Sequence, residues 1–190
     1  MRDEMKAIGF NCSPRAEGNT AQMIKAVFSE LEKEGIKTEL IQVGGKDIRG
    51  CKACGACRKN QDRKCVFGKD GINEYIEKMA AADIIIIGSP TYFADLTTEA
   101  KALIDRCGYV GKGNGGLFKR KIGAAVVSMR RAGAVNVFDS INHFFTISEM
   151  VVPGSSYWNL SMGDFANDVE GTGTMKTLGA NIAWLANKLK

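Results

Sequence analysis

The feature that most constrains this chain is a regular alternation of short apolar runs with longer amphipathic segments. The clearest run is Asp83–Gly88, in which four consecutive isoleucines fit a strand that is buried on both faces of a sheet. Between such runs, apolar residues recur at helical spacing, as Met23, Val27 and Leu31 do. This alternation is typical of a parallel sheet that is covered by helices on both faces.

The pattern predicts five strands and five helices. The strands are expected at Met5–Phe10, Thr38–Val43, Asp83–Gly88, Lys121–Ser128 and Met150–Trp158, the last bent at Pro153-Gly154. The helices are expected at Asn19–Glu34, Ile72–Ala82, Thr97–Cys107, Val135–Ser148 and Val169–Lys190, with loops at Gly44–Gly68, Gly108–Lys119 and Asn159–Asp168. Because crossovers between parallel strands are right-handed, we predict an α/β fold. It is a flavodoxin-like, doubly wound sheet of order 2-1-3-4-5 in three α/β/α layers, with a cysteine-rich insertion after the second strand.

Length and composition narrow the possible classes of protein. The chain has 190 residues, of which 45% are hydrophobic and 25% charged, so a single globular domain spanning residues 1–190 is expected. The longest apolar run is far shorter than the roughly 20 residues that cross a bilayer, and no leader opens the chain. We therefore expect a cytoplasmic protein with no membrane partner. The net charge of +5 is mild, and a dense basic stripe is absent from the sequence, which argues against a nucleic-acid partner.

The loop after the first predicted strand carries the groups that bind a terminal phosphate. Ser13 and Thr20 supply hydroxyls, Asn19 an amide and Arg15 a guanidinium, while Gly18 allows close approach of the backbone. The alternative is an ordinary helix cap at Asn19 or Thr20. The sequence here matches neither a P-loop nor a Gly-x-Gly-x-x-Gly dinucleotide loop. If this loop binds a phosphate, we therefore expect it to be the phosphate of a mononucleotide. FMN is the usual occupant of this fold.

Two further loops are expected at the same edge of the sheet. After the third strand, Pro90 fixes the exit of the chain, Tyr92 and Phe93 supply flat surfaces, and the backbone N–H groups of Thr91–Phe93 can donate to a flavin ring. The alternative is that these aromatic residues only cover the end of the sheet.

The loop after the fourth strand is basic. Arg130 and Arg131 lie between Ser128 and Gly133, where they suit an anion such as a reduced flavin or a pyridine-nucleotide phosphate. The alternative is a solvated basic turn. The three loops together predict a single ligand site.

Four of the six cysteines lie within fifteen positions. Cys51, Cys54, Cys57 and Cys65 follow the spacing with which a compact loop wraps a [4Fe–4S] cluster, although a zinc site or free thiols are alternatives. The basic residues around them would favour a negatively charged cluster and could attract an acidic carrier such as ferredoxin; they are Arg49, Lys52, Arg58, Lys59, Arg63 and Lys64. The other two cysteines stand apart. Cys107 is expected to be buried, and Cys12 to be either packed or reactive.

The motifs Ser13-Pro-Arg-x-x-Gly-Asn-Thr20, Cys-x2-Cys-x2-Cys-x7-Cys and Ser89-Pro-Thr-Tyr-Phe93, with the closing stretch from Val169 to Trp184, resemble the iron–sulfur flavoproteins. These proteins form one branch of the flavodoxin-fold proteins that are similar to NADPH-dependent FMN reductases. The resemblance implies FMN at the three loops and a [4Fe–4S] cluster on the four cysteines. It also implies homodimers or homotetramers in which a cluster can face a neighbour's flavin. A cytoplasmic location, exchange of electrons with ferredoxin, and reduction of oxygen or peroxide follow from the same resemblance.

These observations predict an FMN-dependent electron-transfer flavoprotein in which FMN is coupled to the cluster, with NAD(P)H as a candidate donor. No side chain is expected to act as an essential acid, base or nucleophile, and the single histidine, His143, is expected to pack or to lie at the surface. One alternative is an NAD(P)H-dependent FMN or quinone reductase whose cysteine loop is only structural. Another is a flavin- or metal-binding redox sensor.

Overall fold

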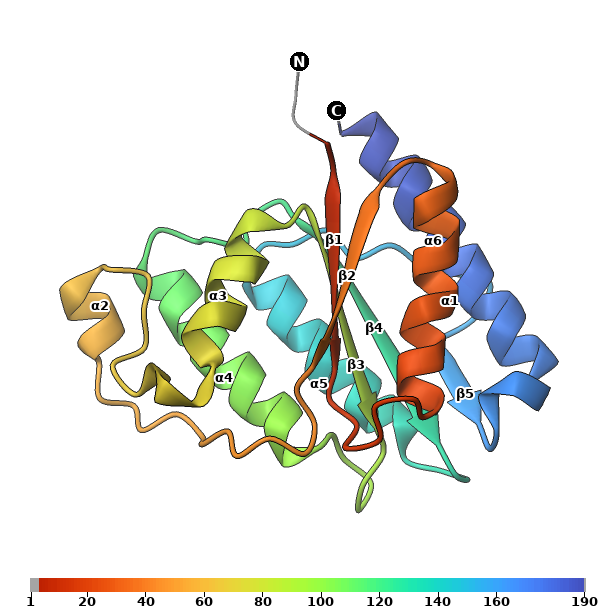
Figure 1. The fold of residues 1–190 in the computed structure, drawn as a ribbon, viewed down its shortest axis with the longest axis horizontal. Helices are drawn as coiled ribbons and strands as arrows, with labels where there is room; N and C mark the ends of the chain where they lie inside the picture. Colours follow the sequence, from red (N-terminus) through yellow and green to blue (C-terminus); the bar gives the residue numbers. More distant parts are fainter. Residues whose placement is uncertain (1–3, 190) are drawn as a thin grey trace.

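The computed structural model describes residues 4–189 and contains a five-stranded parallel sheet of order β2-β1-β3-β4-β5 (Figure 1). The strands are β1 (Lys6–Asn11), β2 (Lys37–Gln42), β3 (Ile84–Pro90), β4 (Ile122–Met129) and β5 (Leu160–Met162). The predicted strand order is confirmed. From β1 the chain runs to β2 on one side and then returns to β3 on the other, so the strand order reverses at β1.

Helices cover both faces of the sheet (Figure 1). The long ones are α1 (Asn19–Lys33), α3 (Ile72–Ala81), α4 (Thr98–Gly113), α5 (Ala134–Ile147) and α6 (Val169–Lys188). Helices α1 and α6 pack together on one face, and α3, α4 and α5 cover the other. The short α2 (Ala56–Asn60) lies in the cysteine-rich insertion at one end of the molecule.

The alternation of side chains along β3 separates two cores. Ile84 and Ile86 pack with α1 and α6, whereas Ile85 and Ile87 pack with α3, α4 and α5. All four are fully buried, because successive residues of a strand point to opposite faces of the sheet. Within residues 4–189, no helix has the length and hydropathy needed to cross a membrane.

The position of the fifth strand differs from the prediction. The expected strand Met150–Trp158 makes only an isolated bridge, between Val151 and Ile122, and β5 instead lies inside the expected loop Asn159–Asp168. Asn159 explains the shift. Its side chain donates to the carbonyl of Ala125 at 2.9 Å and its own carbonyl accepts from the N–H of Val127 at 2.9 Å, so β4 pairs with the chain beyond this residue.

The first half of the predicted loop Gly108–Lys119 is helical, because α4 continues to Gly113. Gly111 shows why glycine is needed inside this helix. A Cβ atom there would lie 2.6 Å from the ring of Phe118, which is buried against the helix. The glycine therefore allows close packing and does not end the helix.

Gly88 of β3 packs closely against α1, and its substitution tests this packing. A Cβ atom at this position would lie 2.7 Å from Thr20 Cγ2 and 2.9 Å from Ile24 Cδ1. We expect Gly88→Ala to lower the free energy of unfolding by about 1–3 kcal/mol because of overpacking. The control Gly173→Ala, on the open face of α6, should raise it by about 0.5–1 kcal/mol. Urea denaturation of both variants measures the difference, and a Gly88→Ala variant as stable as the parent would contradict this packing.

Candidate functional site

The three loops that the sequence singled out meet at the carboxyl edge of the sheet. The hydroxyls of Thr20 and Ser128 lie 2.8 Å apart and join the start of α1 to the end of β4. The N–H of Thr91 donates to the carbonyl of Ser128 at 2.9 Å, which joins the loop after β3 to β4. Gly133 and Ala94 bring the loops after β4 and β3 into contact, since a Cβ atom on Gly133 would lie 3.0 Å from the Cα of Ala94. The predicted convergence of these loops is confirmed.

Two polar residues that the sequence analysis missed shape the loop between β1 and α1. The buried side chain of Asn11 accepts from the N–H of Ser13 at 3.1 Å and donates to the carbonyl of Arg15 at 3.2 Å. It also donates to Gln42 Oε1 at 2.7 Å, and Gln42 Nε2 donates to the carbonyls of Ser13 and Gly44. Both residues end a strand, and that position was the available signal. Together they fix the backbone on which an anion would be bound.

Within this loop, two predicted phosphate ligands already have partners inside the protein. Ser13 is buried and its hydroxyl accepts from the N–H of Arg15 at 3.2 Å, while the hydroxyl of Thr20 pairs with Ser128. Arg15 itself is exposed at the mouth of the loop. Gly18, at the N-cap of α1, has no side chain to satisfy the first N–H groups of the helix. An exposed guanidinium beside a helix N-terminus is suited to bind a phosphate group.

Asn19, another predicted phosphate ligand, also has partners inside the protein. Its amide nitrogen donates to the carbonyl of Gly163, and its amide oxygen accepts from the N–H of Phe165 at 3.3 Å. In this conformation the side chain therefore ties the start of α1 to the loop after β5, because both of its polar atoms have protein partners.

The loop after β3 forms a tight turn that projects from the edge of the sheet (Figure 1). Tyr92 and Asp95 exchange backbone hydrogen bonds at 2.8 and 3.1 Å, and Phe93 and Ala94 between them have φ values of 46° and 64°. Phe93 is fully exposed at the tip, and Tyr92 is partly exposed. Of the three N–H groups predicted to donate to a ring, those of Thr91 and Tyr92 thus already donate within the protein. Thr91 Oγ1 is buried without a partner among residues 4–189, which leaves this hydroxyl available to a ligand.

The loop after β4 is exposed and basic. Arg130 and Arg131 lie at its surface, and Gly133 follows with a φ of 88° as the N-cap of α5. The backbone of Gly133 is in the left-handed conformation and touches Ala94, so there is no room for a side chain and glycine is required here.

The four clustered cysteines line one pocket, of about 230 Å³, between the insertion and α4. Cys51 and Cys54 are exposed, Cys57 and Cys65 are half-buried, and all are free thiols. This volume greatly exceeds the about 30 Å³ share of one water molecule, so the pocket has room for a group of several atoms.

The four thiols belong to the lining of the same pocket. Within residues 4–189, no three His, Cys, Asp or Glu side chains are grouped closely enough to hold a metal ion as they stand. A zinc ion needs its thiolates to meet at one point, whereas the thiolates around a [4Fe–4S] cluster bind different irons. Among the described residues, the pocket lining supplies four thiols and no carboxylate or imidazole, a donor set that fits an iron–sulfur cluster and also fits a four-cysteine zinc site.

The insertion is held against the body of the protein by two asparagines that the sequence analysis did not select. Asn73 of α3 accepts from the N–H of Cys65 at 2.8 Å and donates to the carbonyl of the same residue at 3.0 Å. Asn114 donates to the carbonyl of Cys57 at 3.3 Å and accepts from the N–H of Arg63 at 2.9 Å. Two of the cysteines are thus positioned by side chains from outside the insertion.

The remaining candidates are accounted for by packing or exposure. Burial raises the pKa of the thiols of Cys12 and Cys107, so both stay protonated and pack as small apolar side chains. His143 is exposed on α5.

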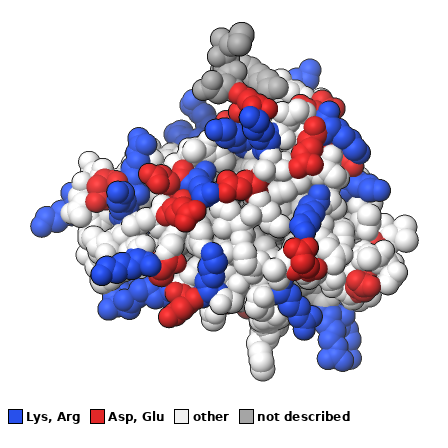
Figure 2. All heavy atoms as spheres, viewed as in Figure 1, with Lys and Arg blue, Asp and Glu red and all other residues white. Residues whose placement is uncertain are grey.

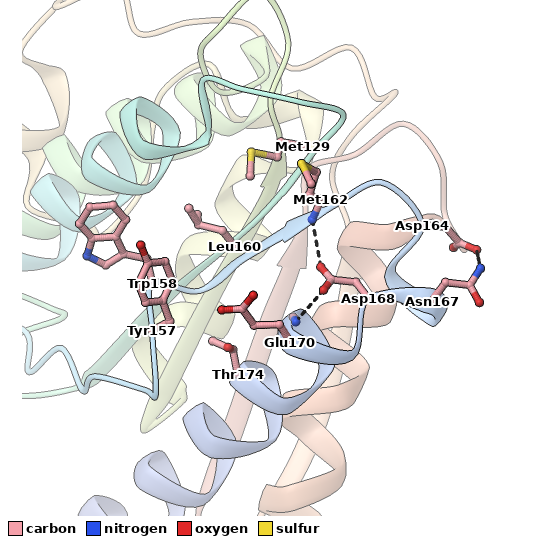
Figure 3. Close-up of a pocket in the computed structure, with 11 residues that line it drawn as sticks. Met129, Tyr157, Trp158, Leu160, Met162, Asp164, Asn167, Asp168, Glu170 and Thr174 are labelled. Atoms are coloured by element: carbon pink, nitrogen blue, oxygen red, sulfur yellow. Dashed lines mark hydrogen bonds between the residues drawn. The ribbon is translucent and has the colours of Figure 1, made fainter.

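A second hollow, of about 470 Å³, lies beside β5 (Figure 3). The rings of Tyr157 and Trp158 form part of its wall, with centroids 5.5 Å apart and planes tilted by 45°, and Asp168 lies at its opposite side. The Asp168 carboxylate accepts from Gly171 N at 2.9 Å, from Met162 N at 3.0 Å and from the hydroxyl of Ser161 at 2.8 Å. Burial raises the pKa of this carboxyl, but the three hydrogen bonds outweigh burial and hold the pKa below its ordinary value.

Comparisons with known proteins show which proteins this chain resembles in sequence. The family model described as NADPH-dependent FMN reductase matches residues 5–164. An iron–sulfur flavoprotein of Methanocaldococcus jannaschii is 33% identical, over 98% of this chain and 100% of its own length. An iron–sulfur flavoprotein of Methanosarcina thermophila is 36% identical, over 80% of this chain and 78% of its own.

Two solved structures show the same fold. A WrbA-like flavodoxin from Agrobacterium tumefaciens has a TM-score of 0.70 at 15% identity, covering 99% of this chain and 100% of its own. The protein RosB, solved with bound 8-demethyl-8-formylriboflavin-5'-phosphate, has a TM-score of 0.72 at 21% identity, covering 97% and 80%.

Asp168 caps α6 and fixes β5, so its charge should contribute to stability. Because its folded pKa is lowered, the contribution is present above the unfolded value of about 3.9 and is lost as the pH falls through the folded value. We expect Asp168→Ala to lower the free energy of unfolding by about 1 kcal/mol near pH 7. Denaturation of the parent and of Asp168→Ala from neutral to strongly acidic pH should show that the difference between their free energies of unfolding disappears in acid. A difference in free energy of unfolding that stays constant across this pH range would rule out a stabilising role for the ionised Asp168 cap.

Proposed function

The chain belongs to the iron–sulfur flavoprotein branch of the NADPH-dependent FMN reductase family, and from this premise we propose that it is an FMN-dependent electron-transfer oxidoreductase. In this proposal FMN binds at the carboxyl edge of the sheet and a [4Fe–4S] cluster binds at Cys51, Cys54, Cys57 and Cys65. The observation that carries it is the presence of four free thiols around one pocket, in a chain whose three loops converge elsewhere.

The flavin site is supported by charge and by the shape of the loops. Arg15 and the N-terminus of α1 would hold the phosphate, on a loop that Asn11 and Gln42 keep in place. Tyr92 and Phe93 would offer aromatic surfaces to the ring, and Arg130 and Arg131 would offset the charge of a reduced flavin. Bound FMN supplies one- and two-electron chemistry and a cluster supplies single-electron transfer, so these residues serve to bind and to orient.

The surface of the insertion supports an acidic redox partner such as ferredoxin. Lys and Arg side chains gather at the α2 end of the molecule (Figure 2). The exposed cations of this basic surface are Arg49, Lys52, Arg58, Lys59, Arg63 and Lys64, with Asp62 among them. Such a surface would steer an acidic carrier to the cysteine pocket.

Other parts of the proposal do not rest on the site. A homodimeric or homotetrameric assembly rests on the likeness to the family. A cytoplasmic location, a single domain, and an absence of nucleic-acid and membrane partners rest also on length, charge and hydropathy.

A second candidate is an NAD(P)H-dependent flavin reductase whose cysteine loop is only structural. The description of the matching family favours it, and Arg130 and Arg131 could bind a nucleotide phosphate. Iron and sulfide analysis of protein that is purified without oxygen separates the two candidates. Flavin with rapid NADPH oxidation and no iron would favour the reductase.

Arg15 is the most direct test of the flavin site. A charge-assisted hydrogen bond contributes about 1.5–3 kcal/mol. We therefore expect Arg15→Ala to raise the FMN dissociation constant by about tenfold or more. The control Lys25→Ala removes an exposed cation further along α1, which pairs with Glu17. Fluorescence titration of apoprotein with FMN measures both constants. Equal affinity in the two variants would overturn the phosphate assignment.

The cysteines provide the test of the cluster site. We expect Cys57→Ala to lose most of its iron and sulfide after anaerobic purification, because one of the four pocket thiols is removed. Cys107→Ala is the matched control, since this buried thiol lies outside the pocket lining. Iron and acid-labile sulfide assays compare both with the parent. Iron retained in Cys57→Ala at the parental level would refute the assignment of this ligand.

A further inference from the structure

Arg106 of α4 is a charged side chain that is only 1% exposed, and it lines the cysteine pocket. Its guanidinium donates to the carbonyl of Phe67 at 2.7 Å, to the carbonyl of Arg49 at 3.1 Å and to the carboxylate of Asp70. It also donates to the sulfur of Cys65 at 3.4 Å. The sequence analysis did not select this residue, which lies 41 positions beyond Cys65.

The positions of the acceptors show what Arg106 holds. Arg49 lies two residues before Cys51, and Phe67 lies two residues after Cys65, so the guanidinium binds both ends of the cysteine segment from a helix outside it. Two carbonyls at opposite ends of a loop are thereby fixed to one rigid group. Arg106 therefore holds the two ends of the cysteine segment together beside the pocket.

A buried guanidinium is costly unless it is paired, and Asp70 supplies the pairing. Three oxygen acceptors would be enough for a structural role. One arm of the guanidinium nevertheless also points to Cys65, the cysteine that lies furthest along the chain from the other three pocket thiols. The other cations that line the pocket, Lys52 and Arg58, are exposed and therefore screened by solvent.

We propose that Arg106 is a positioning residue of the cluster site, which closes the cysteine segment and donates a charge-assisted hydrogen bond to the ligand Cys65, thereby raising the reduction potential of the cluster. The proposal rests on the proposed function, since it needs a cluster on the four cysteines. The physical reason is that reduction adds negative charge to the cluster and its thiolates. A buried N–H donor with a positive charge stabilises that reduced state more than the oxidised one.

Asp70 provides a matched variant with the opposite electrostatic effect. Its carboxylate accepts from Arg106 and from the N–H of Arg49 at 3.3 Å. Asp70→Asn removes the negative charge beside Arg106 with little change in volume, whereas Arg106→Gln removes the positive charge. Both variants loosen the same network, so a merely structural role would move both in the same direction.

The experiment measures the cluster potential of the anaerobically purified holoprotein by redox titration with EPR detection. We expect Arg106→Gln to lower the equilibrium constant for cluster reduction by about tenfold, a negative shift of about 59 mV for one electron. Asp70→Asn should shift the potential in the positive direction. Arg106→Lys keeps the charge but loses the planar set of guanidinium N–H donors, so its cluster potential should lie between those of the parent and Arg106→Gln. Arg58→Gln, the exposed control, should change the potential least.

The outcomes separate this proposal from the one on which it rests. A parent protein without iron and sulfide overturns both. A parent that holds its cluster, with Arg106→Gln and Arg106→Lys at the parental potential, overturns the role of Arg106 alone. Shifts of the same sign in Arg106→Gln and Asp70→Asn also overturn it, because they indicate a loosened loop. If Arg106→Gln does not fold, Arg106→Lys and Asp70→Asn decide the question by the sign of their shifts.

Discussion

The burial of β3 on both faces is the constraint on which the rest of this structure depends. Every residue of the strand is buried, and its isoleucines belong alternately to the two cores. A slip of one residue would exchange the faces of the whole strand, so its register with β1 and β4 is fixed. The carboxyl ends of these three strands therefore lie side by side, and the loops that follow them must meet at one edge.

This part of the architecture could be predicted from the sequence because continuous apolar runs such as Ile84–Ile87 indicate buried parallel strands without help from distant residues. The short strand β5 could not. The run Met150–Trp158 has the apolar character of a strand, but the side-chain bond from Asn159 to Ala125 decides where β4 finds its partner. In the same way, Gly111 interrupts a helical pattern in the sequence, yet its packing against Phe118 keeps α4 intact.

In the candidate site, too, some features could be predicted from the sequence and others could not. Residue types identified the loops and the cysteine segment, because phosphate and iron select hydroxyl, guanidinium and thiol groups. The contacts that position these groups lie far apart in the sequence and leave no local pattern. Asn11 meets Gln42, Thr20 meets Ser128, and Arg106 meets Cys65 only in the folded chain. Asn19 is the instructive case, because its amide fits a phosphate by type but ties two loops together in the structure.

Helix α4 links the two regions of the proposed function. It begins at Thr98, directly after the loop that follows β3, and it reaches the cysteine pocket at Arg106. Eight residues of helix span about 12 Å along its axis.

The most direct test of the proposed FMN and cluster sites is the content of FMN, iron and acid-labile sulfide per chain in protein purified without oxygen. We predict FMN together with matching amounts of iron and sulfide. A colourless preparation that takes up neither FMN nor iron and sulfide on reconstitution would contradict it.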